Sequence, residues 1–209
     1  MIFAIYKPKD ISSAKALNIV KKKFPGEKIG HAGTLDPLAE GVLVVAVGAD
    51  TKRLKHEVAA EKEYIADIML GATSTTDDEE GAKTVRTIAA SPSRGIVDQA
   101  LQKFVGNIEQ TPPLYSAVKI GGREAYKYAR RGKPVELKPR TVKIKNIELL
   151  DYRYPRIKLK VTTGPGVYIR SLARDLGEVL KTGGYLAGLL RTRVGKYTIE
   201  TAERIEKGA

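Results

Sequence analysis

The chain has 209 residues, of which 42% are hydrophobic and 29% are charged, so it can bury a sizeable core and falls outside the class of disordered proteins. It carries 37 Lys and Arg against 24 Asp and Glu, and this formal net charge of +13 favours polyanionic partners. With no cysteine the chain cannot form disulfides or thiolate zinc sites, and His31 and His56 are too few for a His-rich metal centre.

The N-terminal part predicts a strand, a helix and a buried strand. Apolar residues alternate over residues 1–8, which end at a proline. Residues 12–24 carry apolar side chains at helical spacing, with Ser12 or Ser13 as the N-cap. The run GVLVVAVG at 41–48 is apolar throughout and bounded by glycines, which is typical of a strand covered on both faces.

The middle of the chain predicts a strand, a loop and two helices. Residues 62–71 alternate as a strand does, whereas residues 73–84 are polar and rich in turn formers. We expect this second segment to be a surface loop with a solvated acidic run. Helical spacing returns at 93–105 and at 123–132.

The C-terminal part predicts two more strands, at 140–152 and 156–163, and then a helix at 168–181. The apolar stripe of that helix leaves Arg170 and Arg174 together on another side, one turn apart. Because strands often follow strands without an intervening helix, the pattern indicates an α+β fold with a mixed, largely antiparallel sheet flanked by helices.

The positive charge is concentrated in one part of the chain. Residues 121–160 hold 13 basic and 4 acidic residues, so we expect nucleic acid as the partner. No stretch approaches the roughly 18 apolar residues that a membrane span requires, and the N-terminus is charged too soon for a signal peptide. We therefore expect a cytoplasmic protein with no membrane association.

Asp36 stands in an unusually constrained loop. Pro37 pushes it out of the helical region, and Gly33 and Gly41 permit the backbone dihedrals of a tight loop. An Asp in such a loop is more often a turn former than a functional group. The residues alone leave both interpretations open.

Long motifs surround this Asp. GHAGTLDPLAEGVLVVAVG contains the Asp-Pro loop and the buried run, and the others follow in one order: YKP, KEYIADIMLG, QTPPLYSAVKIGGREAYKYARRG, GPGVYIRSLARDLG and LLRTRVGKYTIE. Over nearly the whole chain these segments resemble the TruB-type tRNA pseudouridine synthases, in which this Asp is catalytic. One segment departs from the family pattern: KPKDISS has Asp10 where the family usually has Gly and Ser12 where it has Thr.

The resemblance implies the pseudouridine synthase fold and an isomerase that converts a uridine at position 55 of the tRNA T-loop into pseudouridine. The N1–C1′ bond breaks and the uracil rejoins through C5, with no cofactor or metal. Residues 1–209 would form the catalytic domain, without the C-terminal PUA domain that members usually carry, as a short form or a fragment. We expect a monomer that binds the tRNA T-arm stem-loop.

The resemblance also implies site residues. Asp36 is the catalyst, Arg170 its ion partner and Tyr64 the platform for a flipped base, with proton acceptor as its second candidate role. A carboxylate in a dry pocket needs such a cation to stay ionised. The other implied pocket residues are His31, Tyr168, Leu189 and Lys7, the last lining the pocket or steadying its loop. The residues expected to contact RNA phosphates are Arg123, Lys127, Arg130, Arg131, Lys133, Lys138 and Arg140.

Three other functions remain open at this stage. An RNA chaperone would use the same basic surface without catalysis. A metal-dependent phosphohydrolase would use Asp36, Asp77, Asp78 and Glu79, although these acids lack a recognisable ligand spacing. A serine hydrolase would need a base for Ser171, and the chain has no G-x-S-x-G motif.

Overall fold

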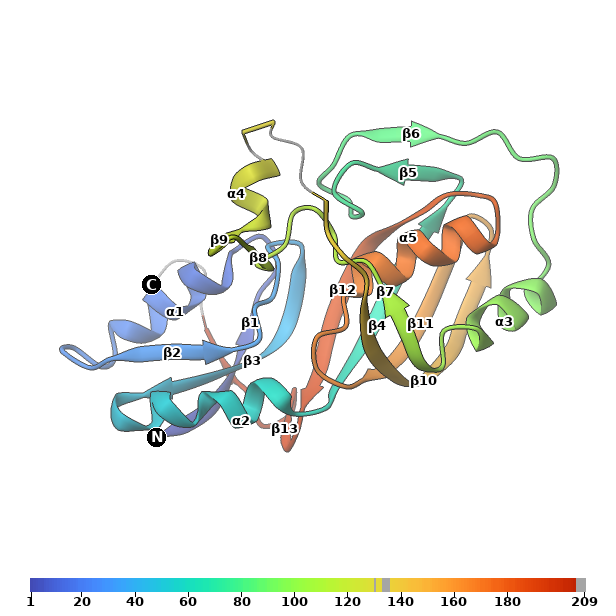
Figure 1. Cartoon of the computed structure of the whole chain (residues 1–209). Helices are drawn as coiled ribbons and strands as arrows, with labels where there is room; N and C mark the ends of the chain where they lie inside the picture. Colours follow the sequence, from blue (N-terminus) through green and yellow to red (C-terminus); the bar gives the residue numbers. More distant parts are fainter. Residues whose placement is uncertain (130, 133–135, 206–209) are drawn as a thin grey trace.

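Most of the apolar runs become strands of one long mixed sheet (Figure 1). The structure is a computed structural model that describes residues 1–129, 131–132 and 136–205. The strands of the sheet are β1 (Ile2–Lys7), β2 (Ile29–Ala32), β3 (Ala39–Val47), β4 (Lys62–Leu70), β7 (Gly106–Gln110), β10 (Arg140–Arg153), β11 (Arg156–Thr163), β12 (Gly184–Val194), β13 (Tyr197–Thr198) and β14 (Glu203–Arg204).

The sheet has the order β14-β1-β3-β12-β4-β11-β10-β7, with β2 beside β3 and β13 beside β12. Among the described strands of this sheet, β1 pairs in parallel with β14 and β3 with β12, and the other pairs are antiparallel. The predicted α+β class with a mixed, largely antiparallel sheet is therefore confirmed.

Short helices and two small hairpins complete the described elements. The helices are α1 (Ser13–Lys21), the 3-10 helix η1 (Gly48–Arg53), α2 (Leu54–Ala59), α3 (Arg94–Gln102), α4 (Ala125–Ala129) and α5 (Ile169–Val179). The hairpins pair β5 (Ala72–Ser74) with β6 (Lys83–Val85) and β8 (Lys119–Ile120) with β9 (Arg123–Glu124). Ser12 caps α1 by accepting a hydrogen bond from the backbone N–H of Lys15, as the capping preference predicts.

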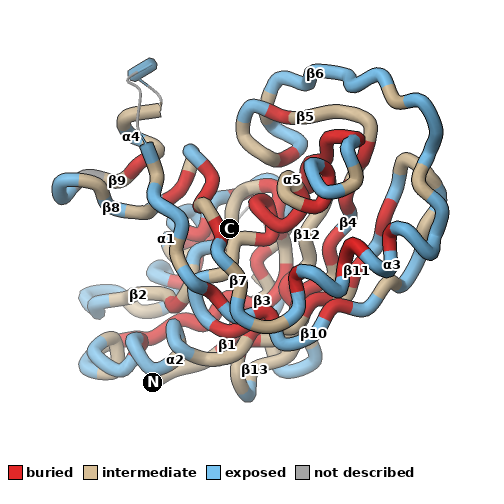
Figure 2. The backbone as a smooth tube through the Cα atoms, turned by 45° about the vertical axis from the view of Figure 1, so that its right-hand side comes forward, coloured by how far each residue is buried: buried red, intermediate tan, exposed pale blue. Residues whose placement is uncertain are grey.

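The core is divided by the sheet into separate clusters. In the largest, Leu172 and Leu176 of α5 pack with Ile68 of β4 and Leu159 of β11. A second cluster puts α1 against Leu43 and other residues of β3, and a third puts α2 against the opposite side of β3. Figure 2 shows the resulting buried stretches in red along α5 and the central strands. The prediction that 41–48 is covered on both faces is thus confirmed.

The other face of β4, β11 and β10 is polar and carries cross-strand ion pairs. Lys158 lies 3.8 Å from Asp67, and Lys160 lies 3.3 Å from Glu63. These pairs follow from the strand register, which puts Lys158 opposite Asp67 and aligns the alternating basic residues of β11 with the acids of β4. Part of the basic stretch is therefore matched by acids within the sheet.

The segment 73–84 corrects an expectation. It is not a solvated loop, because it forms the β5–β6 hairpin, whose connection folds back against β12 and α5. The Leu186 N–H donates to the Asp77 carbonyl at 3.0 Å, and the Asp78 side chain is only 3% exposed. Glu79 and Glu80 stay exposed, so only half of the acidic run is solvated.

Strand β12 lies at the centre of the sheet, yet its pattern did not predict a strand. Its pairing with β4 shifts register between Leu186 and Gly188 and again between Arg191 and Arg193. Each bulge reverses the alternation of side chains along the strand. The alternation of buried and exposed side chains that would indicate a strand is therefore lost in β12, which lies between β3 and β4 in the sheet.

Replacing Gly41 tests the junction between β3 and β12. Gly41 has φ +107°, and a Cβ there would lie 2.2 Å from the carbonyl oxygen of Arg191. Gly26 has φ +81° with no atom within 4 Å of a Cβ, so it serves as the control for backbone strain alone. We expect Gly41→Ala to lower the free energy of unfolding by about 2 kcal/mol or more beyond Gly26→Ala in chemical denaturation, because the clash adds to the strain. Equal losses would contradict this close approach.

Candidate active site

The loop that carries Asp36 is fixed at both sides. The hydroxyl of Ser13, at the start of α1, donates to the Leu35 carbonyl at 2.8 Å and accepts from the Leu35 N–H at 2.9 Å. The Asp10 N–H donates to the Pro37 carbonyl at 2.8 Å. Helix α1 and the segment before it therefore determine where the carboxylate stands, before β3 begins.

The departure at Asp10 is compatible with this loop. Asp10 has φ +68°, in the left-handed region where glycine is favoured and where Asp and Asn are the next most tolerated residues. The chain thus keeps the turn that a glycine would make.

A buried arginine pairs with Asp36. Arg170 lies in the first turn of α5, and its Nε is 3.0 Å from Asp36 Oδ2, while its Nη1 is 3.3 Å from Asp78 Oδ2. The side chain of Asp36 is 37% exposed, compared with 6% for Arg170 and 3% for Asp78. Of these three charged groups, Asp36 is the one that a ligand can reach.

Backbone carbonyls complete the coordination of Arg170. Its Nη2 donates to the Tyr115 carbonyl at 2.9 Å, and its Nη1 donates to the Thr76 carbonyl at 3.3 Å. The guanidinium is therefore held from three segments of the chain. Its position fixes that of the Asp36 carboxylate beside it.

The surroundings of Asp36 raise its pKa. Burial is the main cause, and the negative charge of Asp78 acts in the same direction. Arg170, Lys7 and Arg191 oppose the shift, because each favours the charged carboxylate. Asp36 is thus a carboxylate with a higher proton affinity than an exposed Asp, which suits acid–base or nucleophilic chemistry.

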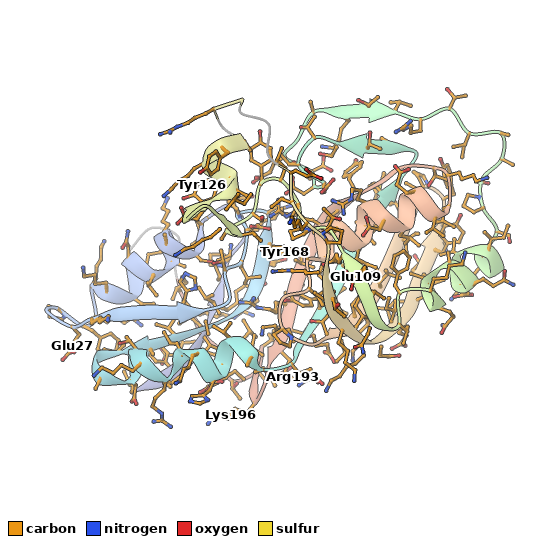
Figure 3. The ribbon with its side chains drawn as sticks, viewed as in Figure 1. Glu27, Glu109, Tyr126, Tyr168, Arg193 and Lys196 are labelled. Carbon is orange, nitrogen blue, oxygen red and sulfur yellow. The ribbon has the colours of Figure 1, made fainter. Side chains whose placement is uncertain are left out.

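One apolar cluster contains residues that adjoin both charged groups in the chain, Leu38 after the Asp36 loop and Ile169 before Arg170. Tyr64 of β4, Leu38 and Leu189 belong to the same core cluster, and Leu189 stands between Ala39 and Ala66 in the strand register. Tyr168 is the N-cap residue of α5, two positions before Arg170. Figure 3 labels Tyr168 near the centre of the molecule, between the two halves of the ribbon.

Arg191 is a site neighbour that the sequence analysis missed. It is opposite Tyr64 in the strand register and almost fully buried. Its Nε donates to the Val42 carbonyl at 2.8 Å and its Nη2 to the Gly33 carbonyl at 2.9 Å. Burial lowers its pKa, while Tyr64 and Asp36 raise it. An arginine inside an apolar central strand could have signalled a buried partner, but β12 had not been recognised as a strand.

Lys7 and His31 lie beside the same loop. Lys7 is completely buried, and its Nζ donates to the carbonyls of Ile11 at 2.6 Å and Pro8 at 3.0 Å. Burial lowers the pKa of Lys7 to about 8, and Asp36 opposes this shift. Of its two expected roles, this geometry favours steadying the loop over lining a pocket.

His31 is half-buried in β2, and its Nδ1 has no hydrogen-bond partner among the described residues. Burial is the main cause that lowers the His31 pKa, and Arg191 adds to it. The lowered pKa favours the neutral form of the His31 imidazole.

The basic residues fall into different environments. Arg131 and Lys138 are exposed, whereas Lys127 forms an ion pair with Glu124 at 2.8 Å. Arg140 stacks on Tyr168, with its guanidinium carbon 5.1 Å from the ring centroid. Two predicted phosphate contacts, Arg130 and Lys133, lie outside the described residues. For Arg123 the structure describes the backbone but not the side chain.

Three of the four acidic residues of the phosphohydrolase alternative, Asp36, Asp77 and Asp78, pair with arginines, and Glu79 pairs with Lys83. Asp78 pairs with Arg170, and Asp77 lies 2.8 Å from Arg174. Within the described ranges no cluster of three His, Cys, Asp or Glu could hold a metal ion. The buried hydroxyl of Ser171 donates to the Thr111 carbonyl at 2.8 Å, so its proton is directed to a backbone carbonyl and not to a catalytic base.

A cavity of about 640 Å³ opens at the sheet but contains neither Asp36 nor Arg170. Its lining includes Asp67, Met69 and Lys158, together with Leu38 and Leu189. It therefore adjoins the Asp36 site without including the ion pair.

No helix in the described part of the chain has the length and apolar character needed to cross a bilayer.

Solved structures with the same fold define the class. A chain of a Cbf5–Nop10–Gar1 complex superposes with a TM-score of 0.76 at 30% identity, over 98% of this chain and 52% of that one. A pseudouridylate synthase shares the fold alone, with a TM-score of 0.50 at 16% identity, over 97% of this chain and 66% of that one. The fold is thus that of the pseudouridine synthases. The present chain spans about half of the Cbf5-complex chain.

Sequence comparisons give the family. Residues 21–169 match the model of the TruB family pseudouridylate synthase N-terminal domain. The tRNA pseudouridine synthase B of Phocaeicola vulgatus is 48% identical over 179 residues, which cover 86% of this chain and 76% of that protein. That of Francisella tularensis subsp. tularensis is 43% identical over 207 residues, 99% of this chain and 68% of that protein. The chain belongs to the TruB family of pseudouridine synthases, an enzyme family of isomerases, which confirms the resemblance.

The raised pKa of Asp36 predicts an acid limit for the reaction. A reaction that needs ionised Asp36 loses rate as pH falls through this pKa, which lies above the 3.8 of an ordinary Asp. Because the Asp78 charge raises the Asp36 pKa, Asp78→Asn is expected to move the acid limb of the single-turnover rate to lower pH.

Asp77→Asn is the matched control, because Asp77 pairs with Arg174 and not with Arg170 or Asp36 through its side chain. Its acid limb should stay at the wild-type pH. An Asp78→Asn limb that does not move, or that moves to higher pH, would contradict the assigned electrostatics.

Proposed function

We propose that this chain converts a uridine of tRNA to pseudouridine at position 55 of the T-loop, with Asp36 as the catalytic residue. The observation that carries the proposal is the 3.0 Å ion pair between the reachable carboxylate of Asp36 and the buried Arg170. The identity to tRNA pseudouridine synthase B proteins supports tRNA as the substrate. The chemistry then follows from the position of this carboxylate.

The reaction is an isomerisation in which no electrons are gained or lost overall. The N1–C1′ bond breaks, the uracil turns, C5 bonds to C1′, and the proton that leaves C5 is matched by one gained at N1. An ionised carboxylate held beside the ribose can act as nucleophile or as base in this exchange. Both roles require the charge that Arg170 favours on Asp36.

The uridine has to leave the RNA stack to meet Asp36. Tyr64 and Leu189 offer an aromatic and an aliphatic surface in the cluster beside the loop, and Tyr168 offers a second ring at the start of α5. Flipped bases are held by such faces and by hydrogen bonds to their polar edges. In this proposal His31 contacts the RNA near the same loop, and Lys7 steadies the loop, which is supported by its hydrogen bonds to the Ile11 and Pro8 carbonyls.

The β8–β9 hairpin supports an RNA-binding role for the basic stretch. Gly121 and Gly122 have φ values of +55° and +82°, which suit the tight turn between β8 and β9. Exposed Arg131 and Lys138 follow it along the chain. A related solved structure, an H/ACA RNP, is bound to a substrate RNA. We propose the T-arm stem-loop as the ligand, bound by one copy of the chain in the cytoplasm.

Asp36→Asn tests the catalytic assignment. The variant keeps the size of the side chain but loses its charge, so we expect it to bind an unmodified T-arm stem-loop and to form no pseudouridine on chemical mapping. Asp67→Asn is the control, because Asp67 is an exposed acid paired with Lys158 on the polar face of the sheet. Product from Asp36→Asn at a rate near that of the control would refute the role of Asp36. The RNA chaperone alternative predicts instead that Asp36→Asn forms no pseudouridine and yet keeps the full biological activity of the wild-type chain.

Salt dependence tests the basic surface. Each phosphate neutralised by Lys or Arg releases counterions, so the binding constant for T-arm RNA should fall steeply on a log–log plot against salt. Arg131→Ala and Lys138→Ala are each expected to reduce the slope by about 1. A plot that is already flat for the wild-type chain would mean that this surface does not contact the phosphates.

A further inference from the structure

We propose that Gln110 and Arg140 act as a two-strand clamp that positions Tyr168, and that Arg140 is therefore a positioning residue and not a phosphate contact. The inference rests on the proposed function, in which Tyr168 supports the flipped uracil. It assigns a role to two residues that stand outside the Asp36–Arg170 pair.

The clamp begins with strand register. Gln110 ends β7 and Arg140 begins β10, and the two are directly opposite each other in the antiparallel pair. Opposite residues in such a pair project to the same face. Both side chains reach Tyr168, although it is 58 residues beyond Gln110 in the chain.

Gln110 holds the backbone of Tyr168 at two points. Its Oε1 accepts from the Tyr168 N–H at 2.8 Å, and its Nε2 donates to the Tyr168 carbonyl at 3.1 Å. Gln110 is only 1% exposed, so its carboxamide makes its hydrogen bonds inside the protein and is not available to a ligand. The Tyr168 side chain makes no capping hydrogen bond to α5, and Gln110 supplies polar partners for the backbone of this N-cap residue.

Arg140 holds the ring of Tyr168 and the turn before it. Its guanidinium carbon lies 5.1 Å from the centroid of the Tyr168 ring, and its Nη2 donates to the Gly166 carbonyl at 2.5 Å. Its Nε is buried and has no hydrogen-bond partner among the described residues. A guanidinium stacked and bonded in this way has little freedom to follow an RNA phosphate.

The same strand end is bonded to the first turns of α5. The Thr111 carbonyl accepts from the Ser171 hydroxyl at 2.8 Å and from Arg174 Nη2 at 2.9 Å. The clamp therefore stands in a network that also fixes the helix carrying Arg170. A displaced Tyr168 ring would leave the uracil misplaced relative to Asp36, and an error of about 1 Å can cost up to about 100-fold in rate.

The test measures pseudouridine formation in a single turnover at saturating T-arm RNA, together with RNA affinity as a function of salt. For Arg140→Lys we expect the rate constant to fall by roughly 10- to 100-fold, with an unchanged salt slope and melting temperature. Gln110→Glu should show a similar fall in rate and the same salt slope, but a lower melting temperature, because its carboxylate is buried against the Tyr168 carbonyl. Arg140→Lys keeps the charge but loses the planar stack, and Gln110→Glu keeps an acceptor but loses the donor. Lys138→Ala is the comparison for a phosphate contact, with a lower slope and weaker binding.

A double-mutant cycle shows whether the clamp acts through Tyr168. In a Tyr168→Leu background, Arg140→Lys should cause no further loss of rate, because the ring that it positions is gone. An additive loss would overturn the proposal. So would an Arg140→Lys variant that keeps the wild-type saturating rate and the wild-type melting temperature.

Amide hydrogen exchange supplies a readout that does not depend on activity. Gln110→Glu should speed exchange of the Tyr168 N–H less than Gln110→Ala, which removes the acceptor. If the wild-type chain forms no pseudouridine, the proposed function fails and the clamp proposal fails with it. If the wild-type chain is active and both clamp variants keep its rate, only the clamp proposal fails.

Discussion

The structure of the site depends on one buried guanidinium. Arg170 lies between Asp36 and Asp78. Its pair with Asp78 is buried on both sides, and removing one partner of such a pair typically costs about 3 to 5 kcal/mol, because a charge is left uncompensated. The two carboxylates differ in their roles because they differ in exposure. Asp78 is enclosed and anchors the arginine, whereas Asp36 is accessible and is left with a raised pKa.

The basic character of the chain has two separate physical origins. Lys158 and Lys160 alternate along β11 and pair with acids of β4, so they stabilise a solvated sheet face. Arg131 and Lys138 are exposed on the segment after the β8–β9 hairpin. The formal net charge of +13 is therefore a poor measure of how many basic side chains are available to RNA, because some of them are paired with acids. Arg140 is a basic residue of the same stretch whose guanidinium already stacks on the Tyr168 ring.

The sequence motifs predicted much of the candidate site but not its internal pairing. Asp36 and Arg170 were expected together from the resemblance, and the structure places them in contact. Asp78 was expected to be solvated and Arg191 was not considered, because their partners are distant in the chain. Arg170 and Asp78 are 92 residues apart, and no local period records such a contact. The roles of these residues in catalysis stay predictions.

The sequence by itself determined local features: the buried run of β3, a serine cap at Ser12 or Ser13, and the constrained Asp-Pro loop. Each of these depends on neighbouring residues, whose spacing and backbone preferences can be inferred from the chain. Only the tertiary structure decided which charges are buried together and which strand lies at the centre of the sheet. Those outcomes depend on register and bulges, which are settled when distant segments pack against each other.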